Sequence, residues 1–298
     1  MRKMFRNSSI IFTSFNYLFF AVFIFTILYP FWDLLLLSLS DSKTANSLGF
    51  RIWINEFTLS SYKYCFSNNK IGIAYFNSIF RTVVGTFLTT VVSLFTAYPL
   101  TKRDLPGQKV ITTFFLFTMF FGGGLIPTYL VIRSLGLVDS LWVLILPTLI
   151  SASTVIIVRN TLMTMDKAFE EAAFIDGADY FTILFKVIIP LSKPIIATIA
   201  VWTAVAHWNS WYDCLLYIRD DSKVVLQLIL QRMLDLSRAD ADGVEAFNSM
   251  QEKLNNRPVI SATIRAAITI ITIGPIIIVY PFAQKYFVKG FAVGAVKG

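Results

Sequence analysis

The residues of this sequence that could do chemistry lie together between positions 207 and 213. They are His207, Trp208, Asn209, Trp211 and Asp213, all within one apolar stretch. Trp208 and Trp211 are three residues apart and are expected to share a helical face, where their rings could stack on a flat ligand. Asn209 is the strongest candidate for contact with a hydroxyl-bearing solute, because a buried amide needs a partner. The alternative is an aromatic belt at a membrane boundary, where Trp is enriched.

Two arginines stand within or near other apolar stretches, Arg81 and Arg265. Charges at membrane depth are costly and often functional. If both face a cavity, they could bind carboxylates bidentately, and the solute would be anionic. The alternative is that their long side chains extend to the outer interface and place the charge in water.

Motifs for nucleotide hydrolysis or covalent catalysis are missing. No G-x-x-x-x-G-K-[ST] occurs, and no H-E-x-x-H, G-x-S-x-G or S-x-x-K stands in a plausible context. One histidine and two cysteines, Cys65 and Cys214, fit no metal spacing. We therefore expect no enzymatic activity, metal, cofactor or nucleotide-binding site in this chain.

Membrane spans must position these residues. Hydrophobic residues make up 56% of the chain, charged residues only 15%, and the mean hydropathy is +0.66, whereas soluble domains carry about 25% charged residues. We expect an all-α, polytopic membrane protein with a single transmembrane domain over residues 1–298. The net charge of +8 does not indicate nucleic acid, because the basic residues fall mostly in loops. Six apolar runs approach the roughly 20 residues that cross a bilayer: Ile10–Leu39, Ala74–Leu100, Val110–Ile132, Leu141–Val158, Ile195–Ile218 and Ala262–Phe282.

Lys and Arg are denser in one set of loops, which predicts that both termini are cytoplasmic. Two loops are long. The outer one, residues 219–261, contains an amphipathic stretch, Val224–Leu236, which polar residues Ser237–Gly243 are expected to end. In the third run, Gly122–Gly124 and Pro127 are expected to weaken the helix, beside a cavity or at a close helix contact.

The other long loop, residues 166–194, lies on the inner side and contains EEAAFIDGADYFTILFKVIIPLSKP. Glu170 and Glu171 suit a helix start, and Gly177 suits its end. Asp176 is placed to cap the next helix, and Pro190 and Pro194 mark a hinge before the chain re-enters the membrane. A short helix with small residues is therefore expected on the cytoplasmic face, where it suits a groove on a soluble partner.

This loop resembles the EAA loop of ABC importer permeases. The resemblance rests on Glu171, Ala172, Ala173, Asp176, Gly177 and Ala178, followed by I-x-P-L-x-x-P at 188–194. Residues 120–147, Asn77–Ser78, Ala97–Tyr98 and the W-N-S-W segment at 208–211 resemble the carbohydrate-uptake branch, closest to permeases for larger oligosaccharides or polysaccharide fragments. The resemblance covers the chain from about residue 70 to its end.

The resemblance implies a six-helix permease subunit in a bacterial cytoplasmic membrane, with a second permease, two ATPase subunits and an extracytoplasmic solute-binding protein as partners. Residues Glu170–Ala173 and Asp176–Ala178 would couple ATP-driven closure to transport of an oligosaccharide. The rival interpretation is an ion-coupled secondary transporter of a small polar solute, which would use intramembrane acids such as Asp33 and Asp213. A membrane-anchored receptor or assembly factor would explain the outer loop but not six spans.

Overall fold

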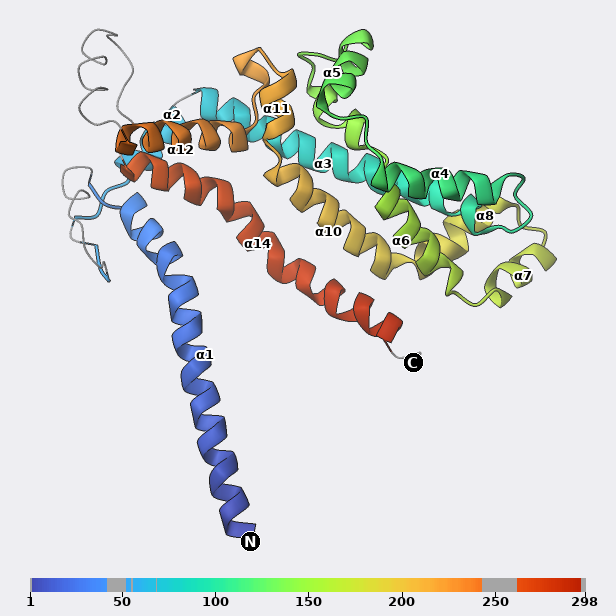
Figure 1. The fold of residues 1–298 in the computed structure, drawn as a ribbon, viewed down its shortest axis with the longest axis horizontal. Helices are drawn as coiled ribbons and strands as arrows, with labels where there is room; N and C mark the ends of the chain where they lie inside the picture. Colours follow the sequence, from blue (N-terminus) through green and yellow to red (C-terminus); the bar gives the residue numbers. More distant parts are fainter. Residues whose placement is uncertain (1, 42–51, 55, 68, 243–261, 296–298) are drawn as a thin grey trace. The chain divides into compact units, whose positions relative to one another are not determined.

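The computed structural model describes residues 2–41, 52–54, 56–67, 69–242 and 262–295. This part is helical without strands, as predicted, apart from an isolated antiparallel bridge between Ser40 and Phe57 (Figure 1). It forms two compact units, Met1–Asn68 with Met233–Ile273, and Asn69–Arg232 with Gly274–Gly298. The α-helices are α1 Arg2–Ser38, α2 Ser60–Ser67, α3 Asn69–Ala97, α4 Gln108–Phe120, α5 Leu125–Ser134, α6 Ala152–Met163, α7 Ala168–Ile175, α8 Tyr180–Ile183, α9 Ile189–Leu191, α10 Lys193–Asn209, α11 Tyr212–Tyr217, α12 Leu226–Asp242 and α14 Ala262–Ala295.

The apolar runs of the sequence form helices that could cross a membrane. Three, in α1, α3 and α14, are long and apolar enough alone, and three further pairs of helical segments reach the length together across a sharp bend. Counting each bent pair as one span gives six among the described residues, the predicted number.

The third run is broken where the glycines stand. Helix α4 ends at Phe120, α5 begins at Leu125, and their axes differ by 118°. Gly124 has φ +82°, a conformation that residues with a Cβ rarely adopt. The prediction that Gly122–Gly124 interrupt this helix is therefore confirmed.

In the unit that begins at Asn69, α3 packs along α10. The closest approach is at Gly85, where an added Cβ would lie 2.5 Å from Nε2 of His207. Glycine is therefore required for the two helices to meet at this distance. Both helices are apolar over most of their length, and burial of that surface against each other stabilises the pair.

Two apolar clusters form the core of this unit. The α7-side cluster lies among the ends of α3, α6 and α10 and includes Leu94, Ala97, Val155, Val158, Ile183 and Ile199. The α12-side cluster includes Ile132, Val143, Leu144, Cys214, Tyr217 and Val225. Asn77 Nδ2 donates to the carbonyl of Val224 at 3.0 Å, and Ser78 Oγ accepts from the N–H of Leu226 at 2.9 Å, so α3 holds the start of α12.

Helix α12 is longer than the sequence suggests. The amphipathic stretch begins at Leu226 as a helix and continues through Ser237 to Asp242, so the predicted break at Ser237–Gly243 is wrong for the described residues. Alternating acidic and alanine residues near its end are compatible with helix, and the polar composition there does not break it. Residues 243–261 of the predicted outer loop lie outside the described part of the chain.

Candidate functional site

The EAA-like loop forms the predicted short helix, α7. Glu170 and Glu171 lie in its first turn, and Gly177 follows it with φ +83°, as expected of a glycine that ends a helix. The prediction that Asp176 caps the following helix is wrong. Asp179 caps it instead, since its Oδ1 accepts the N–H of Thr182 at 3.2 Å, while Asp176 ends α7. Bonds from the hydroxyl and N–H of Thr182 hold the pKa of Asp179 below its ordinary value.

Helix α7 exposes apolar side chains. Ile175 is 87% exposed and Phe169 is 52% exposed, and Phe174 packs edge-on against Tyr180. Ala173, on α7, and Ala178, which follows it, pack against the α7-side cluster. Two small residues of the motif therefore seat the loop on the neighbouring helices, while Phe169 and Ile175 stay exposed.

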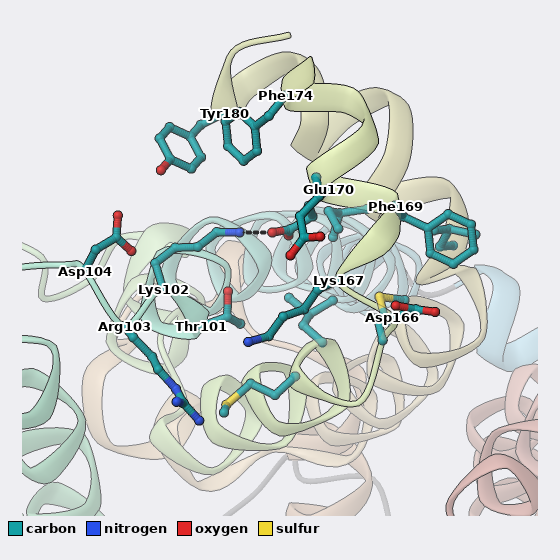
Figure 2. Close-up of a pocket in the computed structure, with 16 residues that line it drawn as sticks. Thr101, Lys102, Arg103, Asp104, Asp166, Lys167, Phe169, Glu170, Phe174 and Tyr180 are labelled. Carbon is teal, nitrogen blue, oxygen red and sulfur yellow. Dashed lines mark hydrogen bonds and ion pairs between the residues drawn. The ribbon is translucent and has the colours of Figure 1, made fainter. Parts of the chain in front are cut away.

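An ion pair joins α7 to the loop after α3. Lys102 donates to Glu170 (Figure 2). Its Nζ also lies 4.6 Å from the centre of the Tyr98 ring. A groove of about 400 Å³ lies beside this pair, between the loop at 101–104, the end of α6 and α7. The sequence analysis missed Lys102, although a lysine in a short basic loop next to an acidic helix start was an available signal.

The chain bends sharply between the two prolines that follow α8. Segments Tyr180–Leu191 and Lys193–Asn209 meet at 79°, at Ser192, which lies between Pro190 and Pro194. A bend is therefore present at the predicted position, while its role as a hinge at the membrane stays a prediction. A π-helical turn, Leu184–Ile188, precedes it, and such turns insert one extra residue into a helix.

The aromatic residues predicted to share one helical face do not. Helix α10 ends at Asn209, and Ser210 has an extended ψ of 128°, so the helical spacing stops between Trp208 and Trp211. Trp208 is buried and packs edge-on against Tyr75, with ring centres 6.0 Å apart. Trp211 packs against Tyr212 and the α12-side cluster, and Asn209 is exposed.

Arg81 is buried in the unit, with 2% of its side chain exposed, and forms an ion pair with Asp213. Its Nη1 donates to the carbonyl of Ser210 at 2.9 Å and to Asp213 Oδ1 at 3.2 Å, and Nη2 donates to Asp213 Oδ2. Asp213 Oδ1 also accepts from Ser210 Oγ and from the N–H of Cys214. The alternative in which Arg81 extends to the outer interface is therefore wrong. Its guanidinium instead donates to the Ser210 carbonyl, just after the end of α10.

Arg81 and His207 line a cavity of about 450 Å³ beside α3, α6 and α10, which we call the Arg81 cavity. Trp202 also lines it and is 43% exposed. The sequence analysis missed most of its wall, because serine and threonine in apolar runs are common and only their convergence singles them out. The hydroxyl-bearing residues of the wall are Thr89, Thr148, Ser151, Thr154, Thr203 and Ser210. Arg265, which was predicted with this group, lies on α14 in the other unit.

These features define a class of protein: a multi-pass helical membrane component with a short helix presented beside its spans. The chain matches the family described as binding-protein-dependent transport system inner membrane component over residues 71–293, and it belongs to that family. The predicted fold class and the predicted permease family are thereby confirmed, and the ion-coupled alternative is not favoured.

Individual relatives agree along nearly the whole chain. The polygalacturonan/rhamnogalacturonan transport system permease protein YtcP of Bacillus subtilis is 38% identical over 269 residues, which are 90% of this chain and 92% of that protein. The arabinooligosaccharides transport system permease protein AraQ of the same organism is 28% identical and covers 94% of each chain. A crystal structure of a bacterial ABC transporter involved in the import of the acidic polysaccharide alginate has a chain with TM-score 0.82 and 32% identity, covering 94% of this chain and 98% of that one.

Proposed function

We propose that this chain is the transmembrane subunit of an ATP-driven importer for an acidic oligosaccharide. The observation that carries the proposal is α7, a short cytoplasmic-type helix with exposed Phe169 and Ile175, fixed to the spans by the Lys102–Glu170 pair. The names of the relatives support the saccharide. Polygalacturonan and alginate both carry carboxylates, which supports the acidic class.

In this proposal an ATPase subunit receives α7 in a groove. Residues Glu170, Glu171, Ala172 and Ala173 with Asp176–Ala178 form the coupling loop, and Ala173 and Ala178 transmit its displacement to the α7-side cluster. ATP closes the ATPase dimer, the bend at Ser192 passes the motion to α10, and the cavity alternates between the two sides of the membrane. Small shifts suffice, because packed helices rearrange between discrete states.

The partners follow from this mechanism. A second permease, two ATPase subunits that bind ATP and Mg²⁺, and an extracytoplasmic solute-binding protein would complete the importer, with both termini of this chain in the cytoplasm. Hydrolysis belongs to the ATPase, and this chain supplies translocation. Helix α12, held to α3 through Asn77 and Ser78, would help receive the solute-binding protein.

Substrate-stimulated ATP hydrolysis and uptake in proteoliposomes containing the whole importer test the proposal. Glu171→Lys and Gly177→Pro should abolish uptake, either by preventing assembly or by leaving hydrolysis without transport. Glu56→Lys is a matched control, because it makes the same charge change on an exposed residue of the other unit, outside the groove beside α7. Wild-type uptake and stimulated hydrolysis in both α7 variants would refute the coupling role.

A further inference from the structure

A second groove, which we call the Arg159 groove, lies where the ends of three helices meet. It has a volume of about 640 Å³ and is lined by the loop after α3, the first turn of α4 and the last turns of α6. Three of its side chains are cationic, those of Arg103, Lys109 and Arg159. No acidic side chain lines it in the part of the chain that the structure describes. The groove therefore presents net positive charge to its occupant.

These positive charges are not compensated by neighbouring carboxylates. None of the three side chains forms an ion pair with another described residue. Arg103 also lines the groove beside α7, and Figure 2 shows its side chain and that of Asp104 pointing in opposite directions. The adjacent carboxylate is thus turned away from this guanidinium. Like charges that share one groove repel each other, and a bound anion relieves that repulsion.

The guanidinium of Arg159 is held in position. Its Nε donates to the carbonyl of Leu100 at 2.8 Å, and its Nη1 donates to Asn160 Oδ1 at 3.2 Å. Gln108 Nε2 donates to the same carbonyl at 2.8 Å, which ties the start of α4 to this point. Both acceptors of Arg159 are neutral, so its orientation is set while its charge remains available. A guanidinium fixed in this way loses little side-chain freedom when it binds a phosphate.

An exposed apolar strip leads away from the groove along α4. Val110 lines the groove, and Val110, Phe114 and Phe117 are each more than half exposed. Their spacing of four and three residues places them on one face of the helix. Cationic side chains at one end of an apolar strip match the headgroup and acyl chain of a lipid. A soluble phosphate would use only the groove and leave the strip unoccupied.

We propose that the Arg159 groove binds the phosphate headgroup of an anionic phospholipid. Arg103, Lys109 and Arg159 hold the phosphate, and one acyl chain follows the strip along α4. The groove stands where the predicted third span begins, at Val110, and therefore at the level of lipid headgroups. Basic pockets at this level attract anionic lipids. The site goes beyond the proposed importer function and does not rest on it, because it requires only that α4 crosses the membrane.

Binding of dioctanoyl phosphatidylglycerol tests the site. The full-length chain, purified in neutral detergent with its bound subunits, would be titrated with this lipid and followed by native mass spectrometry. Each cation near a membrane surface contributes about fivefold to the affinity. Arg103→Gln/Lys109→Gln should therefore raise the Kd of the tightest-bound lipid about 25-fold. Both side chains are exposed, so the fold should be kept. Dioctanoyl phosphatidylcholine, with the same acyl chains and no net charge, should bind the wild type and the double variant equally weakly.

Lys186→Gln/Lys193→Gln is the matched control. It removes two positive charges from exposed lysines of the same unit that line neither the Arg159 groove nor the groove beside α7. The Kd for phosphatidylglycerol should stay at the wild-type value. An equal increase in the control, or an unchanged Kd in Arg103→Gln/Lys109→Gln, overturns the site.

Two further measurements separate the lipid from other occupants. Glycerol 3-phosphate should fail to displace phosphatidylglycerol at equal concentration, because it cannot use the apolar strip. Equal displacement would mean that the groove takes a soluble phosphate, and it would overturn the lipid assignment. Binding of phosphatidylglycerol by the isolated chain but not by the chain with its subunits bound would show that a partner covers the groove, which also overturns the proposal.

Discussion

Substitution of Asp213 should destabilise the protein much more than substitution of its partner Arg81. Arg81 makes two of its three hydrogen bonds to Asp213, so Asp213→Leu leaves a guanidinium that is 2% exposed with only the Ser210 carbonyl. An uncompensated buried charge of this kind costs about 3–5 kcal/mol. Asp213 is 21% exposed and keeps Ser210 Oγ and the Cys214 N–H after Arg81→Met, which should cost about 1–3 kcal/mol.

The double variant Arg81→Met/Asp213→Leu should be less destabilised than Asp213→Leu alone, because no charge remains unpaired. The free energy of unfolding can be measured by denaturant titration of the purified subunit in mixed micelles, with the four proteins of the cycle side by side. Additive effects of the two single substitutions would show that the pair does not form.

Transport gives an independent readout of the same pair. Arg81→Gln should reduce uptake of acidic and neutral glycans by the same factor, once uptake is corrected for protein level. The reason is that the positive charge of Arg81 is already paired with Asp213. A loss confined to acidic glycans would refute this reasoning and would return Arg81 to the role of a carboxylate-binding residue.

Three further predictions concern other contacts. Gly85→Ala should destabilise the subunit by about 1–3 kcal/mol, because the added methyl group overlaps His207. Adding His207→Ala to this variant should restore thermal stability. If Gly85→Ala alone is as stable as the wild type, α3 and α10 do not approach so closely. Lys102→Glu and Glu170→Lys should each lower the ratio of transport to ATP hydrolysis, and the reciprocal double variant should recover it, whereas no recovery would exclude a direct pair. The N–H groups of Asp220 and Arg219 and the Lys223 ammonium lower the pKa of Asp139, so its contribution to stability is present at neutral pH and lost as pH falls through that lowered pKa. Amide hydrogen exchange at residues 219–220 should accelerate in Asp139→Asn at neutral pH, and the difference from wild type should shrink at acidic pH; a pH-independent difference would contradict the assignment.

Local features could be predicted from the sequence where a residue type has a strong backbone preference of its own. Gly124 and Gly177 were placed correctly because positive φ is a property of the residue itself. The EAA-like helix was predicted because its helix formers, acidic first turn and terminal glycine all agree.

One error arose where spacing depends on an element that ends early. Trp208 and Trp211 share a face only if α10 continues, and no glycine or proline between them announces its end at Asn209. The Arg81–Asp213 and Lys102–Glu170 pairs join residues 132 and 68 positions apart, which no local pattern contains. The Arg81 cavity was missed for the same reason, since three separate segments supply its hydroxyl groups.

The separation of Arg81 from Asp213 also has a consequence for biosynthesis. The chain is made from its N-terminus at about 5–20 residues per second, so Asp213 emerges roughly 7 to 26 s after Arg81. During that interval α3 must enter the bilayer with an unpaired arginine near its middle, at a cost of about 2.5–3.5 kcal/mol on the insertion scale. The valine, leucine and phenylalanine side chains of α3 offset this cost one by one. The apolar excess of this helix thus serves its insertion before it serves its packing.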